Sequence, residues 1–153
     1  MGTRSTIAIE YSNGAIEQVY CHWDGYLSNN GKILLDHYMD PYKLRSLIDL
    51  GSLSSLRPEI GVQHPFATPP RFATPEWTEH REKYGNMCTF YGRDRGESNT
   101  EANIYISRDD YLLSNNKEEY DYLFVNGKWY VSDHGRPMES LEAALAEEQE
   151  EVV

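Results

Sequence analysis

The chain contains no run of eighteen or more apolar residues, which excludes an ordinary transmembrane helix. Its N-terminus also lacks the basic-then-apolar pattern of a secretory signal, so we expect a cytoplasmic protein with no membrane role. Cysteine is scarce: Cys21 and Cys88 are the only two, and neither has a second cysteine or a paired histidine at the spacing of a metal site. The sequence therefore predicts two reduced core thiols, no bound metal and no cofactor.

Basic residues are also few, because 14 Lys and Arg stand against 25 Asp and Glu, for a formal charge of −11. Phosphate contacts are made by Lys and Arg, so direct nucleic-acid binding is not expected. Much of the acidic excess is local: residues 137–153 hold six Glu and no Lys or Arg. This segment predicts an acidic C-terminal helix or tail over 139–153, which either keeps the chain in solution or serves as an interaction tail.

The chain is rich in aromatic residues and in segments where apolar and polar residues alternate. Its 153 residues, 39% of them hydrophobic, with twelve Tyr and three Trp, suit a single domain with one core over 1–153. The patterns predict an α+β fold, with a mainly antiparallel sheet of about five strands and three or four helices packed on it. Strands are expected within 6–11, 15–23, 87–92, 102–107, 119–125 and 128–133, and helices over 32–39, 41–50, 75–82 and 138–149.

Two Asn-Gly pairs, at 13–14 and 126–127, predict tight hairpin turns. If the first turn is a two-residue loop, Ser12 faces Ala15 and the strand register runs outward from there. The pairs expected at the open end of this hairpin are Thr3 with Asp24, Arg4 with Trp23, and Ser5 with His22. This register would bring the polar end of the first strand against the segment YCHWDGY, residues 20–26.

YCHWDGY is the densest run of chemically capable side chains. The first interpretation of this segment is a binding surface. Trp23 and Tyr26 lie next to a predicted loop, where aromatic rings can stack on a base or dock on a partner; for Trp23, core packing is favoured. Ser5, His22 and Asp24 on one face would permit a Ser-His-Asp arrangement. Nothing in the sequence indicates an oxyanion hole or an exposed nucleophile, so a polar cluster at the hairpin end is the favoured interpretation.

A second candidate site is FYGRDRGES, residues 90–98. In a strand, Arg93 and Arg95 would lie on one face, where two guanidinium groups could grip a phosphate or carboxylate, while Asp94 faces the other way. The alternative is a turn with surface ion pairs, and it is the favoured one. The ligand- or partner-binding candidates are therefore Arg4, His22, Trp23, Asp24, Tyr26, Arg93, Asp94 and Arg95.

One long segment has little regular pattern. Residues 57–75 hold five of the seven prolines and repeat Phe-Ala-Thr-Pro at a six-residue step. Two copies of four residues are too short for a repeat architecture, so the segment is expected to be a long, ordered surface loop.

The start MGTRS, the segment CHWDGY and the segment GRDRGE together resemble a group of small uncharacterised proteins of bacteria and their phages. The resemblance covers most of the chain up to about residue 130, and it implies a phage or prophage accessory protein. The resemblance implies no particular activity and assigns no role to any residue. With the small size and negative charge, it favours a protein that acts by binding a host protein, such as an inhibitor of a CRISPR nuclease or another nucleic-acid-binding defence protein.

Two other functions stay open at this point. The first is a binder or enzyme acting on a small phosphorylated molecule or nucleotide, which requires Arg4, His22, Asp24, Arg93 and Arg95 to converge around a pocket. The second is assembly into a homo-oligomer through an edge strand. Whether the chain is an enzyme is left open, with binding favoured because no convincing catalytic set is present.

Overall fold

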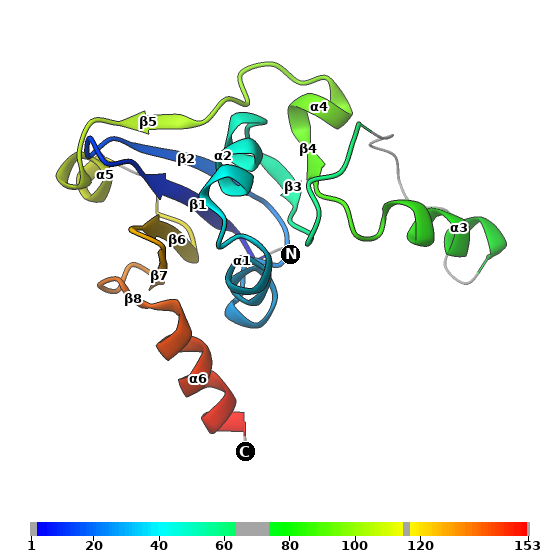
Figure 1. Ribbon diagram of the computed structural model, residues 1–153. Coiled ribbons are helices and arrows are strands. Elements are labelled where there is room, and N and C mark those ends of the chain that lie inside the picture. The colour runs from blue at the N-terminus through cyan, green and yellow to red at the C-terminus, as the bar shows by residue number, and fades with distance from the viewer. Residues whose placement is uncertain (1–2, 64–73, 115–116, 153) are drawn as a thin grey trace.

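The computed structural model describes residues 3–63, 74–114 and 117–152 (Figure 1). It confirms the α+β class, but the sheet is larger than expected and mixed: within the described residues it has eight strands, in the order β4-β3-β2-β1-β6-β7-β8, with β5 also paired to β2. The strands are β1 (Ser5–Glu10), β2 (Ile16–Cys21), β3 (Leu53–Ser55), β4 (Thr89–Phe90), β5 (Asn103–Tyr105), β6 (Tyr120–Val125), β7 (Lys128–Asp133) and β8 (Glu139–Ser140). The helices are a π-helical turn η1 (Leu27–Gly31), α1 (Lys32–His37), α2 (Pro41–Asp49), α3 (Pro75–Tyr84), α4 (Tyr91–Arg95), α5 (Arg108–Ser114) and α6 (Leu141–Val152).

The expectation of a mainly antiparallel five-strand sheet fails at two pairings between strands far apart in the sequence. β1 and β6 run parallel, with Ser5 beside Tyr120, and β2 and β3 run parallel, with Cys21 beside Leu53. Both pairings join segments that no short turn connects, so turn signals in the sequence do not reveal them.

The first hairpin forms, but its predicted register is wrong by one residue. Ser5 pairs with Cys21 and Glu10 pairs with Ile16. The loop has three residues, because Tyr11 N–H donates to Ala15 O at 2.8 Å, Gly14 N–H donates to Tyr11 O, and Gly14 has φ of 89°. A β-turn followed by a left-handed glycine is the usual geometry of three-residue hairpin loops. Since a shift of one residue exchanges the two faces of a strand, Ser5 and His22 do not share a face.

The second Asn-Gly pair forms the two-residue turn that was predicted. Val125 pairs with Lys128, and Asn126 and Gly127 have φ of 49° and 78°. Positive φ at both central residues is the geometry that favours Asn-Gly here. This turn fixes the register of β6 against β7 from end to end.

One face of the sheet packs against helices α1, α2 and α6. Ile7, Val19 and Tyr122 lie fully or almost fully buried on this face. Predicted helix signals are confirmed in α2, whose N-cap Asp40 accepts a hydrogen bond from Tyr42 N–H at 2.9 Å and whose stop, Gly51, has φ of 88°. Cys21 and Cys88 are both free and buried on this side of the molecule, and burial raises the pKa of the Cys21 thiol to about 12.

The acidic helix begins later than expected. Residues 139–140 form β8, which pairs with β7, and α6 follows from Leu141 to Val152. Leu141, Ala144 and Leu145 are buried, as their stripe predicted. The first two turns of this helix therefore belong to the core, and from there α6 extends away from the sheet (Figure 1).

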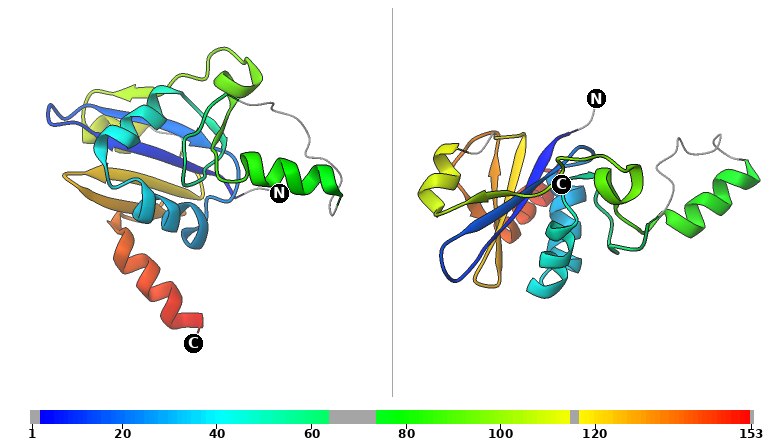
Figure 2. Two further views of the ribbon diagram at one scale, coloured as in Figure 1. Left: turned by 45° about the vertical axis from the view of Figure 1, so that its right-hand side comes forward. Right: turned by 90° about the horizontal axis from the view of Figure 1, so that it is seen from above.

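The expected long loop is described only at its two ends. Residues 64–73, including most of the Phe-Ala-Thr-Pro repeat, lie outside the described residues. The helix predicted at Pro75 is confirmed as α3, which stands apart from the sheet in Figure 1 and in the right-hand view of Figure 2. In the described ranges, no helix combines the length and apolar character needed to cross a membrane.

The second face of the sheet is covered by α5, with a smaller core that contains Ala8, Ile16, Tyr111 and Leu123. This face also buries polar side chains, which the sequence patterns did not indicate. Asp121 is 1% exposed, and its Oδ1 accepts a hydrogen bond from Thr6 Oγ1 at 2.6 Å. Burial raises the pKa of the Asp121 carboxyl, because the charged form loses its hydration.

This burial predicts a pH-dependent stability difference for Asp121→Asn. With a raised pKa, folded Asp121 binds more protons than the unfolded chain, so its contribution to the free energy of unfolding falls as pH rises from 3.8 through the folded-state pKa. We expect the variant to be more stable than the parent by about 1–2 kcal/mol at pH 7, and the difference to shrink toward pH 3.8.

Urea unfolding across this pH range measures the difference, with Glu101→Gln, at an exposed position outside the helices and strands, as the control that should show none. A variant less stable than the parent at pH 7 would mean that the Asp121 charge is stabilising.

Candidate functional site

The segment YCHWDGY lies at one end of the sheet, which we call the aromatic end. It is formed by the first residues of β1 and β6 and the last residues of β2 and β7, because Ser5 pairs with both Cys21 and Tyr120, and Tyr120 pairs with Asp133. β2 stops at Cys21, yet His22 N–H and Trp23 N–H continue along β3 by donating to the carbonyls of residues 53 and 54 at 3.1 and 3.0 Å. The aromatic end is therefore built from four strands and not from one loop.

The chain turns sharply at Asp24 and Gly25. Asp24 has φ of 56°, a left-handed conformation that is uncommon outside glycine and is frequent at functional sites. Gly25 N–H donates to Thr3 O at 2.7 Å, and a Cβ at this position would lie 2.6 Å from the Cβ of Ser5. The absence of a side chain at residue 25 therefore allows the two segments to approach, and the predicted meeting of the N-terminal residues with YCHWDGY is confirmed.

The buried side chains of Asn30 and Tyr122 hold this turn in place by hydrogen bonds. Asn30 is fully buried, and its Nδ2 donates to Ser5 Oγ at 3.1 Å and to Trp23 O at 3.4 Å. Tyr122 is also fully buried, and its hydroxyl donates to Gly25 O at 2.6 Å. The turn that contains Asn30 is the π-helical turn η1, an irregularity often found at functional sites. The backbone under Trp23, Asp24 and Gly25 is thus held by buried hydrogen bonds.

The aromatic side chains of this segment face outward from that base. Trp23 and Tyr26 are 43% and 40% exposed. The His22 ring lies edge-on to Trp23 at 4.7 Å between centroids, and His22 Nδ1 is 2.8 Å from the Tyr20 hydroxyl. The favoured prediction, that Trp23 packs in the core, is wrong. Its ring lies on the surface and contacts the His22 ring.

A Ser-His-Asp arrangement is not present. Ser5 is fully buried and its Oγ accepts the hydrogen bond from Asn30, so it is not an exposed nucleophile. The imidazole of His22 bonds to Tyr20 instead. The polar-cluster interpretation of this end is the one that matches the geometry.

Arg4 reaches the same end of the sheet. Its side chain is exposed, and its carbonyl accepts a hydrogen bond from Tyr120 N–H at 3.3 Å. Burial raises the pKa of Tyr20, and the Arg4 guanidinium opposes that shift. Arg4 therefore lies near the Tyr20–His22 pair, although on the strand register it is not the partner of Trp23.

The structure corrects the prediction for the second candidate site, FYGRDRGES. The segment after Phe90 is the short helix α4 and not a strand, so Arg93 and Arg95 do not share a face by alternation. Arg93 donates to Asp94, to the carbonyls of residues 60 and 61, and to Cys88 O at 2.9 Å. Its guanidinium ties three segments of this chain together, which is a structural role.

Asp94 and Arg95 also have contacts of their own and do not point toward a shared ligand position. Asp94 is 9% exposed, and its Oδ2 accepts from Phe90 N–H at 2.8 Å at the start of α4. Arg95 is exposed, with its Nε 4.0 Å from a Glu97 carboxylate oxygen. The structure therefore does not combine Arg93, Asp94 and Arg95 into a single site with their functional groups facing one ligand.

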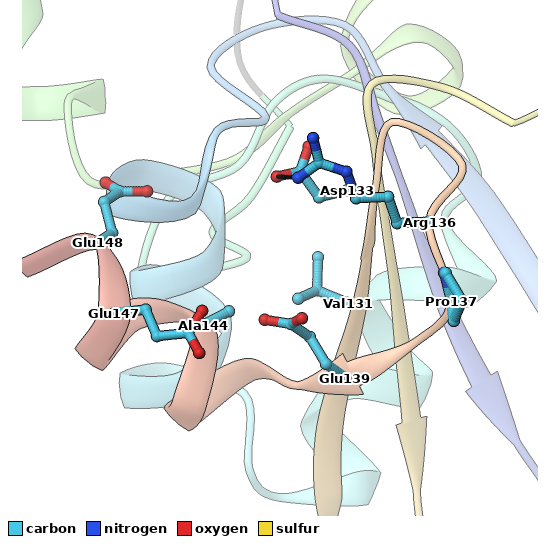
Figure 3. A pocket seen from close by; sticks show the side chains of 8 residues that line it. All are labelled: Val131, Asp133, Arg136, Pro137, Glu139, Ala144, Glu147 and Glu148. Carbon is cyan, nitrogen blue, oxygen red and sulfur yellow. Dashed lines mark ion pairs between the residues drawn. The ribbon is translucent and has the colours of Figure 1, made fainter. Parts of the chain in front are cut away.

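Carboxylates surround the aromatic end on the side of α6. α6 packs against η1, and Figure 3 shows Glu147 and Glu148 of α6 facing Asp133 and Glu139 across a pocket of about 190 Å³. Burial raises the pKa of Tyr120, and the carboxylates of Asp133, Glu148 and Glu119 raise it further. Acidic side chains therefore lie close to Tyr120 at the aromatic end and disfavour its ionised form.

Tyr20, Asn30 and Tyr122 are site residues that sequence reasoning missed. Asn30 lies in Ser-Asn-Asn-Gly, which is typical of any loop, and Tyr122 alternates like every other strand aromatic. The contacts of Asn30 with Ser5 and of Tyr122 with Gly25 join segments far apart along the chain, so spacing carries no signal for these two residues. Tyr20 differs, because its partner His22 is two residues away on the same segment.

Comparison with known proteins gives no match, whether to a protein-family model, to a curated protein or to a solved structure. Among the residues that the structure describes, no three His, Cys, Asp or Glu side chains gather in a way that could hold a metal ion.

Proposed function

We propose that this protein acts by binding another protein through the aromatic end of the sheet, with Trp23 and Tyr26 as the main contacts. The observation that carries the proposal is the pairing of exposed aromatic rings with a base fixed by buried hydrogen bonds. Tryptophan and tyrosine dominate binding energy at protein interfaces, and a surface that is already ordered loses little entropy on binding.

The charge around the aromatic end supports a partner with a basic surface. Glu118, Glu119, Asp133 and Glu148 lie close enough to act on Tyr20, Tyr120 or Tyr122. Arg4 and Arg136 are basic side chains nearby, and Arg136 Nη1 lies 3.9 Å from an Asp133 carboxylate oxygen, so the acidic groups outnumber them. Complementary charge speeds encounter and discriminates between partners. A nucleic-acid-binding protein presents such a basic surface, and occupying it would block its substrate.

The biological setting that this suggests is a phage accessory protein that inhibits a host defence protein. The resemblance of MGTRS, CHWDGY and GRDRGE to small bacterial and phage proteins supports this setting. The acidic sequence of the C-terminal segment fits the same interpretation, since α6 begins beside η1 and so beside the aromatic end.

The charge component is tested by affinity purification from a lysate of the cells in which the gene resides. We expect the captured partner to have a basic surface and to bind about five- to tenfold more weakly to the triple variant Glu119→Gln, Glu147→Gln, Glu148→Gln at about 0.1 M salt. The matched control neutralises Glu76, Glu79 and Glu82 on α3, which makes the same change in net charge away from the sheet.

Removing residues 139–153 would be a poorer test, because Leu141 is fully buried and the truncation would disturb the core. Equal weakening by both triple variants would mean that net charge alone matters. No weakening by either would remove the acidic surroundings from the mechanism.

A further inference from the structure

The strand β5 forms an open edge of the sheet. Among the described residues it pairs with β2 alone, along residues 16–18, and Figure 1 shows it as the outermost strand there. An open edge strand presents unpaired backbone N–H and C=O groups to any other extended chain, and proteins usually guard it with charged side chains, proline or a bulge. Residues 102–106, Ala-Asn-Ile-Tyr-Ile, contain neither a charged residue nor a proline.

This edge also exposes two large apolar side chains. Ile104 is 71% exposed and Ile106, which follows the strand, is 81% exposed. Tyr105 is buried on the other face, with its ring edge-on to Tyr111 of α5. Since side chains alternate along a strand, Ala102 and Ile104 lie on the face away from Tyr105. The edge therefore offers apolar surface beside its open backbone groups.

The hydrogen-bond pattern of β2 shows which backbone groups of β5 face outward. Tyr20 N–H donates to Ser52 Oγ, just before β3, at 3.2 Å, so Tyr20 turns its backbone toward the side of β2 that β3 and β5 share. Alternate residues of an antiparallel ladder turn the same way, so the β2 partners of Asn103 and Tyr105 bond to β5. The N–H and C=O of Ile104, which lies between them, are therefore directed to the open edge.

We propose that two copies of this chain associate through β5, paired antiparallel about a twofold axis at Ile104. The Ile104 N–H of each copy donates to the Ile104 C=O of the other, so this edge is its own complement. The two exposed Ile104 side chains meet on one face, and Ala102 lies opposite Ile106 of the second copy. The pairing joins the two sheets into one continuous sheet.

The charges along this edge favour a second copy as the occupant. Two chains that each carry a formal charge of −11 repel one another, so copies can meet closely only where like charges are not opposed. Residues 102–106 are uncharged, and the nearest charges on either side have opposite sign, Glu101 before β5 and Arg108 after it. Antiparallel pairing brings the Glu101 end of one copy to the Arg108 end of the other. Any extended chain matches the backbone groups, whereas the apolar residues and the flanking charges match this same edge.

The contact is short, because β5 has three residues, so we expect a weak dimer with a Kd of about 10–100 μM at physiological salt. Sedimentation equilibrium of the full chain measures it. Ile104→Lys should weaken the dimer at least tenfold, because two ammonium groups would meet at the axis, and the exposed position leaves the fold intact. The matched control is Val62→Lys, which makes the same change in charge at a side chain that is 65% exposed and should leave the dimer unchanged.

Cysteine crosslinking tests the register, because only a residue on the twofold axis meets its own copy. In Ile104→Cys the two Cα atoms would lie about 5.5 Å apart, within reach of a disulfide. In Ile106→Cys the two thiols would be displaced by four residues, about 13 Å along the strands. Diamide should therefore link Ile104→Cys into a dimer at least tenfold faster than Ile106→Cys, and the buried Cys21 and Cys88 supply no competing thiol.

A chain that stays monomeric up to about 500 μM would overturn the proposal, as would a dimer that Ile104→Lys leaves intact or that Val62→Lys weakens equally. Equal crosslinking at positions 104 and 106, or assemblies larger than a dimer, would also contradict it. None of these results bears on the aromatic end, because β5 pairs with the first residues of β2 and the aromatic end contains the last.

Discussion

Trp23→Ala is expected to weaken binding of the captured partner by about 30-fold or more, the loss that defines an interface hot spot of about 2 kcal/mol. The ring is 43% exposed in the free protein and is supported by the edge of His22, so alanine removes contact area without opening the core. Tyr26→Ala should act in the same direction, because its ring is 40% exposed on the same turn.

The matched control is Tyr42→Ala. Tyr42 is 82% exposed on α2 and lies outside the aromatic end. Surface plasmon resonance with each variant gives the affinities, and thermal unfolding shows that the variants are folded. If Tyr42→Ala weakens binding as much as Trp23→Ala does, the partner does not dock where we propose.

Gly25→Ala is expected to lower the free energy of unfolding by about 3 kcal/mol or more, a large share of the roughly 5–15 kcal/mol of a typical domain. The new Cβ would lie 2.6 Å from Ser5 Cβ and 2.8 Å from Thr3 O. Ser5 is fully buried in β1 and Thr3 O accepts the Gly25 N–H, so neither can move without breaking the turn.

Gly127→Ala provides the comparison for this substitution. Gly127 has φ of 78°, and a Cβ added there would meet no atom of the described residues within 4 Å. Alanine at this position therefore meets only the cost of a left-handed backbone, about 1 kcal/mol. Urea unfolding of both variants separates the steric effect from the backbone effect. Similar losses for the two would mean that the close approach at Gly25 is relaxed easily.

The two Asn-Gly pairs show how far local sequence predicts this fold. Both pairs were expected to form tight hairpin turns, with the first register derived for a two-residue loop; 126–127 forms such a loop, whereas 13–14 is part of a three-residue loop. Asn and Gly accept the positive φ that either loop needs, so the pair itself does not distinguish them. The register, and with it the face on which Ser5 lies, is decided by which residues the two faces of the sheet bury.

The same limit applies to the candidate sites. Trp23 and Tyr26 were predicted from a dense run of functional side chains next to a loop, and both are exposed. Arg93 shares a comparable run, yet its guanidinium binds carbonyls more than thirty residues away along the chain. Asp121 stands within an ordinary alternating strand, yet it is buried and accepts a hydrogen bond from Thr6, more than a hundred residues away along the chain. Such long-range contacts have no periodic signature in the sequence.

The most direct test of the central claim is site-specific photo-crosslinking in the cells in which the gene resides. A photoreactive phenylalanine analogue replaces Tyr26 in one variant and Tyr42 in another, since both side chains are exposed and only the first belongs to the aromatic end. We predict a discrete crosslinked protein from position 26 that position 42 does not yield and that Trp23→Ala suppresses. A crosslinked protein from position 42 alone, or none from position 26, would contradict the account.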